Sequence, residues 1–279
     1  MTSDKVIEGI KITNPDKIID GKHKKIDVVQ YYSDISSLIL PFVADRPLST
    51  IRCPQGTQGE CFFKKHPSQE RGQVEIINDE DEEYFYVKNK KQLIFQVQMG
   101  SIEFHPWLSR VKNIEKPDMM IFDLDPGEDV SLGKLRKAVL LLKDMLSDLG
   151  LATFLKTSGG KGYHILIPFA SCKNWDSLAN FAKQVAVILE EKYPHVFTSN
   201  IRKEKRHGKI FVDWLRNGKG ATCVAPYSLR ARDNLPISFP LAWEELGKIK
   251  PNQINIANYK KYLTENPWHD FWLVKQKLK

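Results

Sequence analysis

Residues 119–126 read MMIFDLDP, an apolar run that ends in two acids one residue apart. A short apolar run of this kind is typical of a buried strand. Because side chains alternate along a strand, Asp123 and Asp125 lie on one face, and Phe122 and Leu124 lie on the opposite, core face. The two carboxylates repel each other unless a cation lies between them or one keeps its proton. The run therefore predicts a metal site at the end of a buried strand; the alternative is a pair of acids that only caps a turn.

A third acid, Asp213, lies near the end of a second apolar run, at residues 210–214. A lone acid in such a run is expensive to bury unless it is paired or binds a metal. If the second strand lies antiparallel beside the first, the three carboxylates meet, although the sequence alone does not establish that pairing. Two divalent ions about 3.5–4 Å apart on such carboxylates suit in-line phosphoryl transfer. We therefore expect Asp123, Asp125 and Asp213 to be catalytic and to bind two Mg²⁺ or Mn²⁺ ions.

A glycine-rich loop, SGGKG at residues 158–162, separates two further predicted strands. Its glycines allow close backbone approach to a ligand, and backbone N–H groups, the Ser158 hydroxyl and the Lys161 ammonium are groups that hold phosphates. The spacing differs from that of a Walker A loop. The loop predicts a triphosphate site; the alternative is a hairpin turn with a solvated lysine. His164 follows the turn and His105 follows a short predicted strand, and either histidine can be structural instead.

The pattern around these motifs predicts the fold class. We expect strands at residues 118–125, 153–157, 163–168 and 210–214, and amphipathic helices from Ser131 to Gly150 and at residues 175–193. In the N-terminal third we expect helices at 26–43 and 92–99, strands at 50–53, 73–77 and 84–87, and a solvated acidic hairpin loop at 79–83. This order predicts an α/β (α+β) fold with a mixed central sheet flanked by helices and a strand-rich N-terminal part.

The composition bounds the class of protein. The 279 residues are 42% hydrophobic and 27% charged, which supports a sizeable core and does not suggest disorder. The net charge of +8 favours a polyanionic partner, although a merely basic soluble protein fits as well. None of the four cysteines (Cys53, Cys61, Cys172 and Cys223) forms a C-x-x-C pair, and we expect reduced thiols in a cytoplasmic protein with access to the chromosome. No signal sequence or membrane span is apparent.

Two segments are candidates for contacts with DNA. FFKKH at residues 62–66 places Phe62 and Phe63 beside lysines, and exposed rings stack on bases while lysines bind phosphates. Both rings can equally belong to the core, and because neighbouring strand residues face opposite ways, we expect at least one ring to be buried. The basic segment 202–209, which also fits a solvated loop, and the later Arg230 and Arg232 are further candidates.

Three motifs in this order and spacing, FDLDPG (122–127), TSGGKGYH (157–164) and FVDW (211–214), resemble those of the archaeo-eukaryotic primase superfamily. They closely resemble those of the polymerase domain of bacterial ligase D and its stand-alone relatives, and the resemblance extends from residue 12 to residue 230. We therefore expect one primase-polymerase domain over residues 1–279, with an N-terminal part at 1–115 that binds DNA ends and a catalytic part at 116–279.

The resemblance implies roles for individual residues. Asp123, Asp125 and Asp213 correspond to the metal triad. The residues implied in nucleotide binding are His105, Ser158, Lys161, Gly162, His164 and Arg230. The residues implied in DNA binding are the aromatic pair Phe62 and Phe63 against the templating base, a pocket for the 5′-phosphate of a downstream strand (Asn14, Lys17, Lys25, Arg52 and Lys65), and Arg206 at the primer. Relatives often carry glutamine where Arg216 stands, which puts contacts with the primer there in doubt.

The function implied by the resemblance is template-directed extension of primers and filling of gaps at DNA double-strand breaks, in non-homologous end joining. The implied substrates are NTP or dNTP, often with a preference for ribonucleotides and manganese, and the implied partners are Ku and a separate DNA ligase. The sequence contains no K-x-D-G ligase motif and no nuclease module.

Three other functions stay open. A primase that starts chains without a primer would use the same acids, although the absence of a zinc-binding module counts mildly against it. A non-catalytic protein that binds DNA ends would gain nothing from clustered carboxylates, which repel DNA. A two-metal nuclease has no use for a triphosphate loop.

Overall fold

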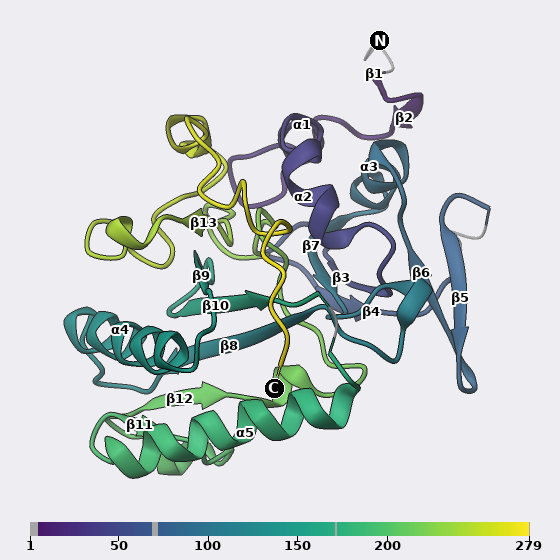
Figure 1. Ribbon diagram of the computed structural model, residues 1–279. Helices are drawn as coiled ribbons and strands as arrows, with labels where there is room; N and C mark the ends of the chain where they lie inside the picture. Colours follow the sequence, from purple (N-terminus) through teal and green to yellow (C-terminus); the bar gives the residue numbers. More distant parts are fainter. Residues whose placement is uncertain (1–4, 69–71, 171, 279) are drawn as a thin grey trace. The chain divides into compact units, whose positions relative to one another are not determined.

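The computed structural model describes residues 5–68, 72–170 and 172–278 (Figure 1). The chain divides into two compact units, which are described separately. Unit 1 comprises Met1–Trp107, Val224–Ser238 and Asn255–Tyr259; unit 2 comprises Leu108–Cys223, Phe239–Ile254 and Lys260–Lys279. In the part of the chain that the structure describes, no helix has the length and apolar character to cross a membrane.

Unit 2 is built on a six-stranded mixed sheet with the order β11-β12-β8-β10-β9-β13. Its strands are β8 (Met119–Pro126), β9 (Phe154–Thr157), β10 (Tyr163–Pro168), β11 (Phe197–Thr198), β12 (Ile210–Asp213) and β13 (Pro240–Leu241). Only β11 and β12 pair in parallel, and the other neighbours pair antiparallel. The mixed central sheet predicted from the sequence is confirmed, and the acidic strand β8 lies between β10 and β12.

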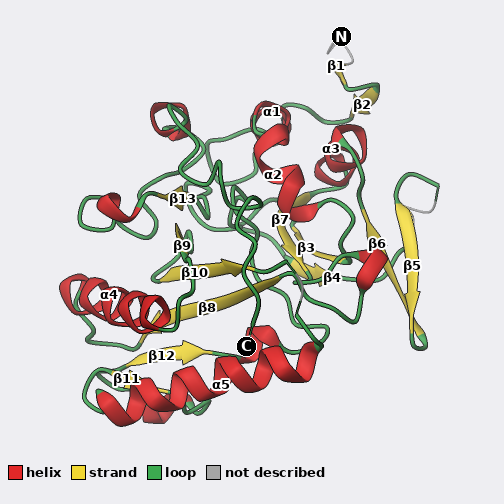
Figure 2. Ribbon diagram, in the orientation of Figure 1, coloured by secondary structure: helices red, strands yellow, loops and turns green. Residues whose placement is uncertain are grey.

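Two long helices, α4 (Leu132–Asp148) and α5 (Trp175–Lys192), pack against β8 (Figure 2). The Ser131 hydroxyl accepts a hydrogen bond from the Lys134 backbone N–H, so α4 begins at the predicted cap. The chain leaves α4 at Gly150, whose φ of +75° is favourable only for glycine. The apolar stripe of α4 is buried at Leu135, Val139, Leu142 and Leu146.

Unit 1 contains helices α1 (Lys25–Asp34), α2 (Ser36–Val43) and α3 (Lys90–Gln98) and a three-stranded antiparallel sheet with the order β4-β3-β7. The strands of this sheet are β3 (Leu48–Arg52), β4 (Phe62–Lys64) and β7 (Ser101–Pro106). Two further hairpins are β1 (Lys5–Ile7) with β2 (Ile10–Ile12) and β5 (Glu75–Asp79) with β6 (Glu82–Tyr86). Unit 2 also contains short 3₁₀ turns, η1 (Val111–Asn113), η2 (Lys203–Lys205), η3 (Leu215–Asn217) and η4 (Trp243–Glu245), and a further turn, η5 (Tyr259–Tyr262), begins at the last residue of unit 1.

The helix predicted at residues 26–43 is two helices, α1 and α2, which break at Ile35. The apolar spacing runs through the break, which is why it predicted one helix. Serine and aspartate on either side of Ile35 are poor helix residues because their side chains compete for backbone groups. The Ser36 hydroxyl shows this competition, since it donates a hydrogen bond to the Ser33 carbonyl.

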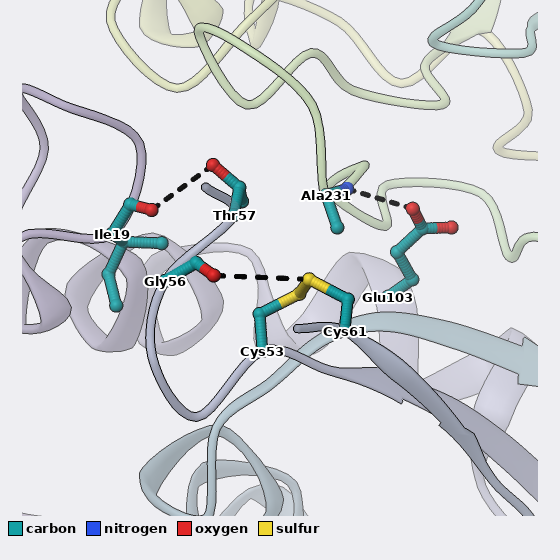
Figure 3. Close-up of a disulfide and its surroundings, with 7 residues drawn as sticks. All are labelled: Ile19, Cys53, Gly56, Thr57, Cys61, Glu103 and Ala231. Atoms are coloured by element: carbon teal, nitrogen blue, oxygen red, sulfur yellow. Dashed lines mark hydrogen bonds between the residues drawn. A yellow bond between two sulfur atoms is a disulfide. The ribbon is translucent and has the colours of Figure 1, made fainter. Parts of the chain in front are cut away.

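The expectation of four reduced thiols is wrong for one pair. Cys53 and Cys61 form a disulfide, whereas Cys172 and Cys223 are buried and not disulfide-bonded (Figure 3). The reason lies in the pairing of β3 with β4, where Arg52 is opposite Phe62. Cys53 follows Arg52 and Cys61 precedes Phe62, so the β3–β4 hairpin brings the two cysteines together. The spacing of the cysteines alone did not predict this hairpin.

The buried stripe of α4 yields a stability prediction. Leu142 is fully buried, whereas Leu140 on the same helix is 43% exposed. We expect Leu142→Ala to lower the free energy of unfolding by about 2–5 kcal/mol, because it leaves a cavity. Leu140→Ala should change it by no more than about 0.5 kcal/mol. Urea denaturation followed by circular dichroism measures both, and equal losses in the two variants would contradict the assigned stripe.

Candidate metal and nucleotide site

The three predicted metal ligands lie on paired strands of unit 2. β12 pairs antiparallel with β8, and Asp213 is directly opposite Asp123. Directly opposed residues share a face of the sheet, and Asp125, two residues along β8, shares it too. The adjacency on which the metal hypothesis depends is therefore present in the structure.

The electrostatics of this face favour a bound cation. Burial raises the pKa of Asp123, but the charge and hydrogen bond of His164 outweigh burial and hold this pKa at about 2. Burial raises the pKa of Asp125, and the charge of Asp123 raises it further. For Asp213, burial and the charge of Asp123 raise the pKa against the opposing effect of Arg216. Two carboxylates that ionise reluctantly beside a third that is fully charged are relieved by a divalent ion.

The donor set fits a hard cation. All three carboxylates offer oxygen ligands, which Mg²⁺ and Mn²⁺ prefer. Among the described residues, the ligand atoms of Asp123, His164 and Cys223 lie within 4.8 Å of one another and form another combination that could hold a metal ion, whereas the three carboxylates are grouped by strand register. Nζ of Lys156 lies 2.8 Å from Nδ1 of His164, and the positive charge of Lys156 disfavours a metal ion on that side of the ring. Of the two sets, only the three carboxylates offer the all-oxygen ligands that suit Mg²⁺ or Mn²⁺.

His164 was expected to hold the triphosphate, and in the structure its ring contacts Asp123. The two residues are opposite each other on β10 and β8, and Nε2 of His164 lies 3.2 Å from an Asp123 oxygen. Nδ1 faces the Lys156 ammonium at 2.8 Å and the Cys223 thiol at 3.5 Å. Burial lowers the pKa of His164, but the charge of Asp123 raises it against burial, and Nε2 carries the proton that is donated to Asp123.

Lys156 and Cys223 were not identified from the sequence as neighbours of the site. For Lys156 a signal existed: it is a lone charge in the apolar strand β9, and it is fully buried. The argument that singled out Asp213 applies equally to this lysine.

Two arginines contact the outer acids. The Arg216 Nε donates to Asp213 at 3.0 Å, so the residue that departs from the family pattern is paired with a predicted metal ligand. Arg206 lies 3.7 Å from Asp125, with its guanidinium stacked 3.6 Å from the centre of the Phe211 ring. The basic segment predicted to contact DNA is thus held beside the acids.

The glycine loop is organised by its own serine. The Ser158 hydroxyl accepts hydrogen bonds from the backbone N–H groups of Gly160 and Gly162, at 3.0 and 3.1 Å. A Cβ at Gly162 would lie 2.2 Å from the carbonyl oxygen of Leu124, the residue between Asp123 and Asp125. Only glycine allows this contact, and it fixes the loop against the acidic strand.

A cavity of about 500 Å³ opens beside the loop. Its lining includes Asp125, the exposed Lys161, Arg206 and His207, together with two further acids. A carboxylate and three groups that carry or gain positive charge are the chemistry that a metal-bound triphosphate requires.

Unit 1 holds the remaining predicted site residues. Phe62 and Phe63 are both exposed, by 42% and 53%, so the expectation that one ring is buried is wrong. They lie on β4, a three-residue strand at the edge of its sheet, where neither face is covered at these rings. His105 lies inside β7 rather than after it.

Three of the five residues predicted to form the 5′-phosphate pocket line one cavity. Asn14, Lys17 and Lys25 line a cavity of about 240 Å³. Burial, and then the charge of Lys17, lower the pKa of Lys25 to about 8. Arg52 and Lys65 do not line this cavity: Arg52 donates to Gln96, and Lys65 pairs with Glu82.

Carboxylates on neighbouring strands beside a glycine loop with a lysine suit the chemistry of a metal-dependent nucleotidyltransferase. The mixed sheet with its two flanking helices agrees with the primase-polymerase fold. The chain belongs to the family of LigD primase-polymerase domains, whose pattern matches residues 24–272. Members of this family are nucleotidyltransferases with polymerase activity, and they depend on metal ions.

Two proteins of similar sequence are named LigD. The chain is 36% identical over 97% of its length to the multifunctional non-homologous end joining protein LigD of Pseudomonas aeruginosa, and 29% identical over 85% to the bifunctional LigD of Bacillus subtilis. It spans 34% and 39% of the lengths of these relatives. Its structure superposes on the polymerase domain of Mycobacterium tuberculosis ligase D in complex with DNA, with a TM-score of 0.87 and 27% identity over 96% of this chain and 99% of the other.

The contact of Gly162 with β8 yields a prediction. Gly162→Ala should lower the free energy of unfolding by about 1–3 kcal/mol, because the added Cβ meets a backbone oxygen that cannot move aside. The control is Gly133→Ala in α4, whose Cβ would meet only the Ser131 hydroxyl at 3.9 Å. The control should be neutral or stabilising by up to about 1 kcal/mol, because alanine favours helix. Urea denaturation separates the two, and a Gly162→Ala variant as stable as the control would disprove the close approach.

Proposed function

We propose that this chain is a template-directed polymerase that extends primers and fills gaps at DNA double-strand breaks during non-homologous end joining. The observation that carries the proposal is the register of β12 on β8, which sets Asp213 beside Asp123 and Asp125. The relatives named above support the end-joining role, because each is an end-joining protein by name.

The residues of unit 2 have distinct tasks in this proposal. Asp123, Asp125 and Asp213 bind two divalent ions, which when present activate the primer 3′-hydroxyl and neutralise the triphosphate. Lys161 and Arg206, which line the same cavity as Asp125, bind triphosphate oxygens. The Ser158 hydroxyl shapes the loop by its two backbone contacts. His164 holds Asp123 in its charged form and in one orientation.

The residues of unit 1 serve the DNA end and the nucleotide. Lys17 and Lys25 bind the 5′-phosphate of the downstream strand in the cavity that they line with Asn14. Phe62 and Phe63 present exposed rings on which a template base stacks, a contact worth about 1–3 kcal/mol per base. His105 and Arg230 bind the incoming nucleotide, as the family resemblance implies.

The finer assignments complete the proposal. The preferred substrate is a ribonucleotide and the preferred metal is Mn²⁺, the partners are Ku and a ligase on a separate chain, and the site of action is the nucleoid in the cytoplasm. Ku and the ligase follow from the end-joining role, which the names of the relatives support.

Primer extension tests the reaction. On a gapped duplex with a 5′-phosphate, the wild-type chain should incorporate NTP and dNTP with Mn²⁺ or Mg²⁺, with NTP and Mn²⁺ giving the higher rate. Asp125→Asn should reduce incorporation by about 100-fold or more, because a metal ligand is lost. Asp148→Asn, at an exposed position at the end of α4, should retain the wild-type rate.

Other outcomes point to other functions. Synthesis of dinucleotides without a primer would identify a primase, degradation of the primer would identify a nuclease, and binding of ends without incorporation would identify a non-catalytic protein. Wild-type activity in Asp125→Asn would refute the assigned metal site.

The 5′-phosphate pocket predicts a pH dependence. Lys25 is charged below its pKa of about 8 and neutral above it. The preference for a 5′-phosphate over a 5′-hydroxyl end should therefore fall as the pH rises from 7 to 9, in contrast to an ordinary lysine, which stays charged throughout. Fluorescence anisotropy with the two ends at each pH measures the preference. Lys25→Gln should weaken it and flatten its pH profile, and Lys91→Gln, at an exposed position in α3, should not. A preference that is constant with pH in the wild type would argue against Lys25.

A further inference from the structure

A buried carboxylate in unit 1 has no part in the function described so far. Glu103 lies in the middle of β7 and is 2% exposed. Burial raises the pKa of Glu103, but its contacts with His105 and the charge of Arg230 outweigh burial and keep this pKa below the ordinary value. Glu103 is therefore charged at neutral pH, and a buried charge persists only where its partners are well placed.

The partners of Glu103 are both residues assigned to the nucleotide. One oxygen accepts from His105 Nε2 at 2.9 Å and from Arg230 Nε at 2.8 Å. The other oxygen accepts from the backbone N–H of Ala231 at 2.8 Å (Figure 3). The Glu103 carboxylate thus links β7 to the segment that contains Arg230, 127 positions further along the sequence. It holds this segment through the Arg230 side chain and through the Ala231 backbone.

The bond to His105 also sets the state of the imidazole. Glu103 and His105 are two residues apart on β7, so their side chains share a face. Because the carboxylate accepts from Nε2, the proton of the ring stays on Nε2, and Nδ1 is the nitrogen presented elsewhere. Arg230 donates through Nε, which orients the plane of its guanidinium.

The network extends to the aromatic pair on β4. The ring of Phe63 meets the ring of His105 edge to face, with 5.6 Å between centroids. Phe63 is 53% exposed, so its outer surface is available for stacking while its edge contacts a histidine that Glu103 holds. Movement of His105 would therefore move the ring against which the template base is proposed to stack.

We propose that Glu103 is a positioning residue for nucleotide binding, which holds His105 and Arg230 in one geometry and supports Phe63 through His105. This inference rests on the proposed function, because it takes His105 and Arg230 as nucleotide-binding residues. Glu103 acts through these two residues and does not itself contact substrate. A 1 Å displacement of such groups is enough to reduce a rate by about 100-fold.

The test is single-nucleotide incorporation by Glu103→Gln, Arg230→Gln and the double variant. The glutamine keeps the shape of the side chain but removes its negative charge and turns one of the two acceptor oxygens into a donor, so it cannot accept from His105, Arg230 and the Ala231 N–H together. We expect KM for the nucleotide to rise about 10- to 100-fold in Glu103→Gln, with kcat changed less and the preference for a 5′-phosphate end, which rests on Lys17 and Lys25, unchanged. The double variant should be impaired more than Arg230→Gln but less than the product of the two single effects, because the part that Glu103 exerts through Arg230 is already lost and the part through His105 is not.

The matched control is Asp118→Asn in unit 2. Asp118 accepts from Arg110 Nε at 3.0 Å, so this variant also breaks an arginine–carboxylate pair, but at residues outside the proposed site. Its KM should equal that of the wild type. A wild-type chain that incorporates no nucleotide would refute the proposed function rather than the role of Glu103.

Several results would overturn the inference itself. One is a wild-type KM for the nucleotide in Glu103→Gln. Another is a double variant in which the effects of Glu103→Gln and Arg230→Gln on KM multiply in full. If Glu103→Gln does not fold, Glu103→Asp keeps the charge but shortens the side chain by one methylene, and it should fold with a raised KM. A folded Glu103→Asp variant with wild-type KM, or failure of both variants to fold while Asp118→Asn folds, would give Glu103 a purely structural role.

Discussion

The mutual repulsion of three carboxylates is the constraint on which unit 2 depends. Antiparallel pairing of β12 with β8 forces Asp213 against Asp123, and the alternation of β8 adds Asp125 to the same face. Folding alone gains nothing from such a cluster, because each charge makes the others harder to bury. The surrounding residues reduce the repulsion in stages: His164 neutralises Asp123, Arg216 contacts Asp213, and Arg206 approaches Asp125. The protein thus keeps its acids together before any ion arrives.

Unit 1 also contains a buried charged group held by partners of opposite charge or by hydrogen-bond donors. There a single buried carboxylate, Glu103, holds a histidine and an arginine, whereas in unit 2 several basic groups surround buried acids. In both units a charge inside a strand is tolerated because backbone register places its partner opposite or two residues away. Strand register is a precise way to hold such groups, since strands move less than loops.

Sequence periodicity predicted the elements of unit 2 well because their apolar patterns are long and their ends are marked. Ser131 caps α4 and Gly150 follows it, as expected, and β10 has the predicted bounds. The motif residues were found by the cost of burying a lone acid, but the same reasoning was not extended to Lys156 or Glu103, which lie in equally apolar strands.

What the sequence did not reveal depends on contacts between distant segments. The disulfide between Cys53 and Cys61 requires the β3–β4 hairpin, and the exposure of both Phe62 and Phe63 requires that β4 be an edge strand. Local sequence patterns do not show the order of the strands in a sheet. The contacts of Arg52 with Gln96 and of Lys65 with Glu82 likewise depend on tertiary packing, which the amino-acid composition does not predict.

The position of β4 bears on how the protein behaves at high concentration. An edge strand with two exposed phenyl rings is a template for self-association, in which another copy adds a strand to the sheet. Here the strand has only three residues, and Lys64 at its end and Lys65 just after it bring positive charge to the rim. Two copies that approach edge to edge would place these ammonium groups against each other, whereas a nucleic acid strand would be attracted. The same lysines thus oppose edge-to-edge association and attract polyanions, so one short stretch of chain bears on both solubility and the charge of the ligands that approach it.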